Sequence, residues 1–218
     1  MTARRRTREA DILRATRVLF DERGVRDAGI EDVSRAAGVN RAIIYRHFTG
    51  KEELFALVLV SYVDDLLAVV EALPDEGDAA ERLTAFADAF LGFCLRYPAF
   101  IDCAMEMLRL PGTELQGRVS DEAMRRMGRA VGSALRHAVA LLRAGDAAGE
   151  FAVDDPDLTA NALYVQVLGL AHLARSGTGV EGLPGGDVRF FAVDEAGVRG
   201  SVRGLVHAML RPTANAAG

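Results

Sequence analysis

The 218-residue sequence has no tryptophan, a single lysine and only two cysteines. Two cysteines cannot form a disulfide framework, so we expect a reducing compartment, the cytoplasm. No apolar run reaches the roughly 18 residues that a membrane span needs, and we expect no membrane association. The basic N-terminus is not followed by an apolar stretch, so a secretory signal is not expected either.

Motifs of catalysis and metal binding are also missing. His47, His137, His172 and His207 have no metal-ligand spacing, and neither a G-x-S-x-G motif nor a P-loop occurs. Gly177–Gly182 spells the G-x-G-x-x-G of dinucleotide sites, but it follows a helical pattern, which favours a mobile loop. We therefore expect no enzyme activity, no cofactor and no metal.

The two cysteines, Cys94 and Cys103, lie nine residues apart with Pro98 between them. They are interpreted as small buried apolar residues, because free cysteine is among the most buried residue types. A thiol redox sensor is the alternative.

Charge is distributed unevenly along the chain. Residues 1–51 contain twelve basic and seven acidic side chains, a net charge of +5, whereas the remainder carries −10. A basic segment attached to an acidic body indicates that only this segment meets a polyanion such as nucleic acid. A chance distribution of solvated charges is the alternative.

Helical periodicity dominates the sequence. Apolar residues recur every three or four positions and no clear alternating pattern occurs, which predicts an all-α fold. The helices are expected at about 7–23, 30–37, 41–48, 50–73, 79–97, 98–110, 115–144, 157–174 and 194–210. Thr49 and Glu52 have capping-box spacing at the start of the fourth helix. Residues 176–187 are rich in glycine and predict a flexible loop.

Residues 30–48 have the features of a helix-turn-helix. Gly38 permits a positive φ in the turn, and Asn40 can cap the helix that follows. The residues expected to pack inward are Val33, Ala36, Val39, Ile44 and Phe48. The residues left for the outer face are Arg41, Ala42, Ile43, Tyr45, Arg46 and His47. Such a helix fits the major groove of DNA, which is about 12 Å wide.

The stretch from Gly38 to Leu54, GVNRAIIYRHFTGKEEL, resembles the signature of the TetR family of bacterial regulators. Gly24 and Ile30–Ala37 also fit, and the similarity covers about residues 7–57. The resemblance implies a three-helix DNA-binding domain at 1–51 and a larger helical effector-binding and dimerisation domain at 52–218. It further implies a transcriptional repressor, released from a palindromic DNA operator by a small hydrophobic or amphipathic effector.

The resemblance also implies which side chains contact DNA. Tyr45 and Lys51 would contact phosphates. The positions facing bases or backbone would be Asn40, Arg41, Ala42, Ile43, Arg46 and His47. Arg41 and Arg46 are the candidates for guanine, because a guanidinium group can engage O6 and N7 together, and Ile43 suits a thymine methyl group.

Three features near this element depart from the family's pattern or have two interpretations. The family usually has serine or threonine where this chain has Gly29, which puts a helix cap and a phosphate contact in question. Glu31 and Asp32 are expected to point away from phosphate. The basic residues before the first helix are Arg4, Arg5, Arg6 and Arg8, and they either enter the minor groove or form a solubilising tail.

The resemblance implies a homodimer in which the helices at 157–174 and 194–210 pair with the same helices of a second subunit. The small residues that permit close approach are Ala160, Ala162, Gly169, Ala171, Gly200, Gly204 and Ala208. The alternative is that these residues only reflect a composition rich in glycine and alanine. A helical dimer that binds a partner protein and has lost DNA binding is the rival function.

The effector pocket is expected among apolar and polar side chains of the later helices, since small-molecule sites are mostly apolar with a few polar groups. The candidates are Phe90, Phe93, Tyr97, Met105, Met124, Met127, His137, Tyr164 and Gln166. Core packing is the alternative for each of them. Effector binding is expected to tilt the helix at 50–73 and to change the separation of the two DNA-binding heads.

Overall fold

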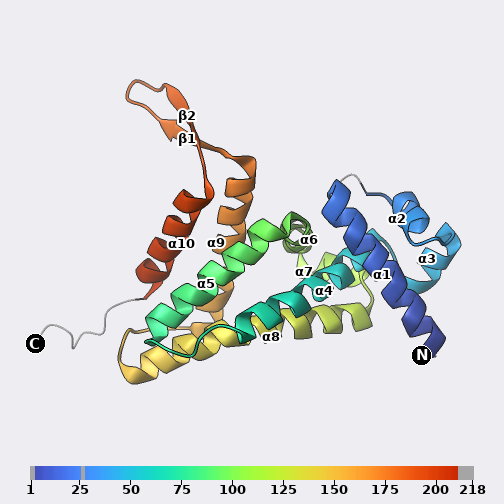
Figure 1. Cartoon of the computed structure of the whole chain (residues 1–218), viewed down its shortest axis with the longest axis horizontal. Coiled ribbons are helices and arrows are strands. Elements are labelled where there is room, and N and C mark those ends of the chain that lie inside the picture. Colours follow the sequence, from blue (N-terminus) through green and yellow to red (C-terminus); the bar gives the residue numbers. More distant parts are fainter. Residues whose placement is uncertain (1–2, 26–27, 211–218) are drawn as a thin grey trace, which may run out of the picture. The chain divides into compact units, whose positions relative to one another are not determined.

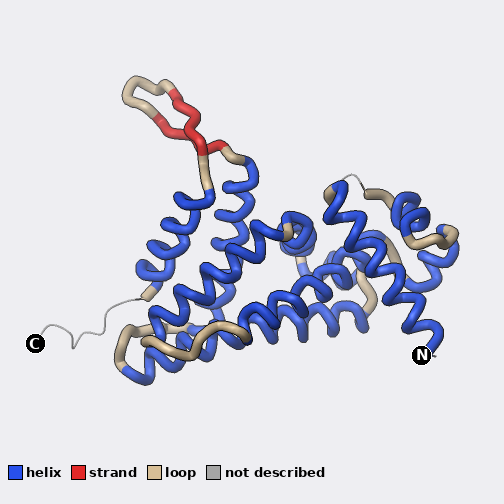
Figure 2. Tube along the Cα trace, viewed as in Figure 1, coloured by secondary structure: helices blue, strands red, loops and turns tan. Residues whose placement is uncertain are grey.

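The computed structural model describes residues 3–25 and 28–210. Within these ranges the chain forms ten helices and one two-stranded hairpin (Figure 1, Figure 2). The helices are α1 (Ala3–Arg23), α2 (Ile30–Ala36), α3 (Arg41–His47), α4 (Lys51–Glu71), α5 (Ala79–Arg96), α6 (Pro98–Arg109), α7 (Gly112–Arg118), α8 (Asp121–Ala148), α9 (Pro156–Ser176) and α10 (Glu195–Met209). The strands are β1 (Thr178–Gly182) and β2 (Val188–Ala192). The predicted all-α fold class is confirmed, with this hairpin as its one departure among the described residues.

The described residues form two compact units. The first contains the chain up to Asp65 together with Tyr97–Gly132, and the second contains Leu66–Arg96 together with the chain from Ser133 onward. Helices α4 and α8 contribute to both units. The boundary between a DNA-binding domain at 1–51 and a body at 52–218 stays a prediction.

Apolar side chains from several helices form the core of the first unit. Ile12 of α1 and Ile44 of α3 are fully buried, and Phe48, which follows α3, is 2% exposed. The rings of Phe20 on α1 and Phe55 on α4 meet edge to face, with centroids 5.4 Å apart. The aromatic contact joins α1 to α4, while α2 packs against both α1 and α3.

The second unit is built around α5, α9 and α10, which pack against one another. Val198, Val202 and Val206 recur every four residues on α10 and are almost completely buried. An ion pair of 2.7 Å between Arg199 and Asp88 joins α10 to α5. The predicted periodicity of the last helix is thereby confirmed.

The predicted helix at 115–144 is two helices in the structure. Val119 is extended, and the backbone N–H of Ala123 donates to the Ser120 hydroxyl at 3.3 Å. Ser120 therefore starts a new helix, a capping role that the prediction overlooked. At its other end α8 continues to Ala148 and is followed by Gly149, whose φ is +74°.

The predicted flexible loop at 176–187 is wrong, because most of this segment belongs to an antiparallel hairpin. The strands pair from Thr178 with Ala192 to Gly182 with Val188. The backbone N–H of Leu183 donates to the carbonyl of Asp187 at 2.8 Å and closes the turn.

Candidate nucleic-acid interface

The turn between α2 and α3 has the geometry that the sequence predicted. Gly38 has φ +62°, and the N–H of Val39 donates to the Ser34 carbonyl at 2.9 Å. The Asn40 side chain accepts a hydrogen bond from the N–H of Ile43 at 3.0 Å, which caps α3. Both predictions, the positive φ and the cap, are confirmed.

The packing of the helix pair is confirmed in part. Val33, Ile44 and Phe48 are at most 2% exposed, and Val39 is half-buried. Ala36, in contrast, is exposed, so its expected role between α2 and α3 is wrong.

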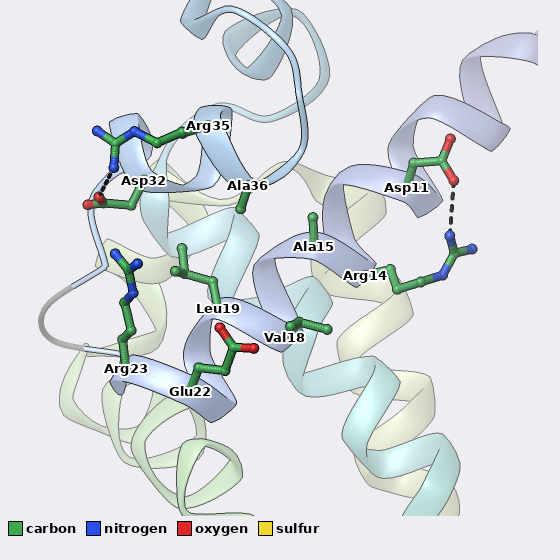
Figure 3. A pocket seen from close by; sticks show the side chains of 10 residues that line it. All are labelled: Asp11, Arg14, Ala15, Val18, Leu19, Glu22, Arg23, Asp32, Arg35 and Ala36. Atoms are coloured by element: carbon green, nitrogen blue, oxygen red, sulfur yellow. Dashed lines mark hydrogen bonds and ion pairs between the residues drawn. The ribbon is translucent and has the colours of Figure 1, made fainter.

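Ala36 instead lines a hollow of about 390 Å³ between α1 and α2, where it lies opposite Ala15 and Leu19 (Figure 3). Small side chains leave this space open. The charges along its rim are largely paired within the chain, as in the contacts of Arg35 with Asp32 at 3.0 Å and of Arg14 with Asp11 at 3.2 Å.

The outer face of α3 carries the side chains that the resemblance assigned to DNA. The exposed residues are Asn40, Arg41, Ala42, Tyr45 and Arg46, while Ile43, His47 and Lys51 are half-buried. Tyr45 is 52% exposed, whereas tyrosine side chains are often buried. This exposure leaves its hydroxyl accessible to a phosphate. Lys51 is the first residue of α4, with its Nζ 5.0 Å from the centroid of the Phe55 ring.

Arg41 is held by an acidic neighbour. Its Nη1 donates to Glu31 Oε1 at 2.7 Å, and both side chains are more than half exposed. Hydrogen bonding to Tyr45 and the charge of Glu31 raise the pKa of Arg41 above its usual value. The expectation that Glu31 points away from the DNA face is therefore wrong, because an exposed guanidinium group attracts the nearest carboxylate.

Asp32 lies at the start of α2, and its expected direction away from phosphate stays a prediction. Its carboxylate accepts from the N–H of Gly29 at 3.1 Å, and this hydrogen bond lowers the pKa of Asp32. Gly29 has no side chain to cap α2, so one half of the capping box is made and the other half is missing.

Arginines of α1 add to the basic face of α3. The first helix begins at Ala3 and not near residue 7, so the basic residues expected as an arm or a tail are helical. A hollow of about 520 Å³ is lined by Arg4, Arg5, Arg8, Ile43, Arg46 and His47. Arg5 Nη2 donates to the carbonyl of Arg46 at 3.3 Å and so joins the start of α1 to the end of α3. Their place on a helix beside α3 was not predicted, although Arg4 and Arg8 have the spacing of one helix face.

His47 sits beside these arginines. Burial is the main cause that lowers its pKa below 6.5, followed by the positive charge of Arg5. Its Nδ1 is buried and makes no hydrogen bond with the described residues. Both effects favour the neutral imidazole in the free protein.

A cluster of polar and aromatic side chains connects α1 to α4. The Arg17 guanidinium group lies 4.1 Å from the centroid of the Tyr62 ring and donates to the carbonyl of Ser61 at 3.0 Å. It also pairs with Asp65. The hydroxyl of Tyr62 donates to Asp21 at 2.5 Å. A displacement of α4 would therefore act on α1 directly.

A second connection surrounds Glu53, which is 4% exposed. Its carboxylate accepts from the N–H of Thr49 at 2.6 Å and from the hydroxyl of Ser120. The predicted capping box of Thr49 and Glu52 is wrong, because α4 starts at Lys51 and the hydroxyl of Thr49 donates to Glu53 instead of accepting from the helix. Glu52 instead pairs with Arg118 at 3.1 Å.

The residues proposed for an effector pocket are divided between the two units. Phe90 and Tyr164 stack in the second unit, with ring centroids 5.8 Å apart, and Phe93 is buried there. The candidates in the first unit are Tyr97, Met105, Met124 and Met127. Met105 is 41% exposed and Gln166 is also exposed, so neither lines an enclosed cavity within one chain.

His137 lines a separate hollow of about 340 Å³ in the second unit. Its other lining residues are Val70, Glu71, Leu73, Pro74, Asp75, Arg82, Phe86, Ala140 and Leu141. Apolar side chains with a few charged ones are typical of small-molecule sites, and the volume falls within their usual range.

Both cysteines are completely buried, and burial raises the pKa of both thiols. This disfavours the reactive thiolate and supports the interpretation as packing residues. Among the residues that the structure describes, no cluster of His, Cys, Asp and Glu is arranged to bind a metal ion. In the same part of the chain, no helix combines the length and the apolar character needed to cross a membrane.

Comparison with known proteins points to the same family that the stretch from Gly38 to Leu54 resembles. Residues 12–58 match the family model described as "Bacterial regulatory proteins, tetR family". Over 87 residues the chain is 37% identical to the HTH-type transcriptional activator FasR of Mycolicibacterium smegmatis, covering 39% of this chain and 40% of that protein. Over 59 residues it is 36% identical to the HTH-type transcriptional repressor KstR2 of Rhodococcus jostii, covering 27% of this chain and 29% of that protein.

The fold match is wider than these sequence matches, which span less than half of either relative. The TetR family transcriptional regulator PfmR from Thermus thermophilus superimposes with a TM-score of 0.59 at 21% identity, covering 92% of this chain and 97% of PfmR. Residues 12–58 therefore match the TetR family model, and the chain has the fold of a solved TetR family regulator.

Proposed function

We propose that this protein is a DNA-binding transcriptional regulator that binds a palindromic operator as a homodimer. The observation that carries the proposal is the continuous basic surface formed by the outer face of α3 and the arginines of α1. Arg41 and Arg46 are the proposed guanine contacts, and Tyr45 and Lys51 are the proposed phosphate contacts. Arg5 and Arg8 extend the phosphate-binding surface.

The homodimer is supported by apolar side chains and glycines that lie exposed on α9 and α10. On α9, Leu158 and Val165 are 66% and 46% exposed. Gly169 on α9, and Gly200 and Gly204 on α10, have open space where a Cβ would lie. Glycine in an exposed helix lowers the stability of the helix by about 1 kcal/mol relative to alanine. Close approach of a second subunit would explain why glycine occurs at these positions.

The regulator acts, in this proposal, as a repressor that a hydrophobic or amphipathic effector releases. KstR2 is named a repressor, whereas FasR is named an activator, so the direction of regulation needs its own test. The hollow beside Phe86 and His137 is the proposed effector site. The contacts of Arg17 with Tyr62 would carry a displacement of α4 to α1 and change the spacing of the two heads.

A footprinting assay on DNA upstream of the protein's own coding sequence tests the proposal. We expect two protected half-sites whose centres are about 34 Å, or a multiple of that, apart along the helix axis. Arg46→Ala should lower operator affinity by at least about tenfold, because one bidentate base contact contributes about 1–3 kcal/mol.

Arg136→Ala is the matched control, since it removes an exposed arginine of the second unit and should leave affinity unchanged. Protection that is absent on all upstream DNA would favour the rival helical dimer that binds a partner protein.

A further inference from the structure

On one face of the β1–β2 hairpin, the residues pack against and pair with one another. The ring of Phe191 covers Gly179 so closely that a Cβ there would lie 2.3 Å from the ring. Beside this contact, Arg189 Nε donates to Glu181 at 2.8 Å. In the register of the strands Gly179 faces Phe191 and Glu181 faces Arg189, so these four residues share one side.

The opposite face is apolar and uncovered. Val180 is directly across from Phe190, and Val188 lies two residues along on the same side. Their exposed fractions are 61%, 68% and 60%. Alternation along each strand thus places three large apolar side chains together in solvent.

A two-stranded hairpin with such a face is only marginally stable in water by itself. This hairpin is nevertheless hydrogen-bonded from its base to its turn. The N–H of Val193 donates to the carbonyl of Gly177 at 3.0 Å, and Leu183 and Asp187 close the other end. Burial of the open face against another surface would supply the missing stabilisation.

The position of the hairpin points to what covers this face. It connects α9 to α10 and projects beyond the ends of both helices (Figure 1). Leu173, 38% exposed, continues the apolar stripe of Leu158 and Val165 along α9 toward the base of the hairpin. The open face is therefore adjacent in the chain to the surface that we assign to the second subunit.

The charge of the hairpin disfavours other occupants. Residues 177–193 contain two acids and one base, and Asp194 and Glu195 follow directly. A surface for DNA or for anionic lipid needs basic residues, so an acidic neighbourhood favours a protein partner.

We propose that the hairpin is an arm whose open face, Val180, Val188 and Phe190, packs against the exposed side of α9 in a second copy of this chain. The inference rests on the proposed homodimer. In a two-fold dimer each subunit gives one arm and receives one, so the contact occurs twice.

Sedimentation equilibrium of the full chain tests this arm. Val180→Ser with Phe190→Ser should raise the dimer dissociation constant by about tenfold or more, because desolvated aromatic residues dominate interface energies. The control, Glu181→Ser with Arg189→Ser, changes the other face of the same strands and should alter the constant less than about twofold.

If the wild type is a dimer and both double variants have the same dissociation constant as the wild type, the arm is overturned and the homodimer stands. A wild-type protein that is monomeric would overturn the homodimer and the arm together.

A cross-linking measurement does not depend on how the serine variants fold. A photo-reactive benzoylphenylalanine is placed at position 190, and isotope-labelled and unlabelled chains are mixed before irradiation. Cross-links between chains that map to α9 support the arm, and cross-links confined to one chain contradict it.

Discussion

Side chains on the proposed DNA-binding surface are already engaged within the protein. Glu31 pairs with Arg41, and the carbonyl of Arg46 accepts a hydrogen bond from Arg5. Partners separated by 10 and 41 residues depend on the fold, so sequence spacing did not predict them. In the proposed complex, DNA would compete with Glu31 for the guanidinium group of Arg41.

Glu31→Gln is therefore expected to strengthen operator binding. The substitution removes the competing carboxylate and one negative charge near phosphate, and a gain of roughly two- to tenfold is expected at low salt. Fluorescence anisotropy with labelled operator measures the gain. Glu76→Gln, in the exposed loop after α4 in the second unit, should have no such effect, and an unchanged or weaker affinity for Glu31→Gln would argue against Arg41 as a base contact.

The pH dependence of operator binding reports on His47. Burial and Arg5 lower the pKa of His47 in the free protein, so the neutral ring is favoured. The contribution of His47 to the stability of the fold is therefore present above pH 6.5 and is lost as the pH falls below it. In the proposed complex, phosphates near Arg5 are expected to raise the pKa of His47, so that binding takes up a proton. Affinity should increase as the pH falls through about 6.5 and should be flatter in His47→Gln. The same slope in wild type and variant would exclude His47 from the interface.

At the scale of elements, local signals account for what was predicted correctly. Gly38 and Asn40 fix the turn and the start of α3 through their own backbone and side-chain chemistry, so the sequence was sufficient to place them. The hairpin was missed because β1 has glycine at two of five positions and the adjacent Phe190 and Phe191 obscure the alternation of β2. Gly185 and Gly186 between β-forming residues were the available signal.

Gly38→Ala should lower the free energy of unfolding of the protein by about 1 kcal/mol. No atom lies within 4 Å of the added Cβ, so the cost comes from the positive φ alone. Urea denaturation measures it. Gly128→Ala is the matched control in the exposed part of α8, where the same added methyl group should stabilise by about 0.5–1 kcal/mol. Equal effects of both substitutions would show that the turn does not need glycine.

At the scale of the whole molecule, the proposed function needs two basic heads, a dimer interface and an effector site. The basic surface is the part that the sequence predicted best, because the resemblance is concentrated in residues 7–57. The effector site was predicted least well. Helical periodicity gave the apolar positions of α5, α6, α8 and α9, but not which of them share a cavity, and Met105 and Gln166 face outward.

The salt dependence of operator binding tests the central claim most directly. The logarithm of affinity should fall linearly with the logarithm of salt concentration, because binding releases cations from phosphates. Lys51→Ala and Arg5→Ala should each reduce the slope by about 1 for every subunit bound, while Arg136→Ala leaves it unchanged. The same slope in wild type and in all three variants would contradict a DNA-binding surface formed by α3, the start of α4 and the start of α1.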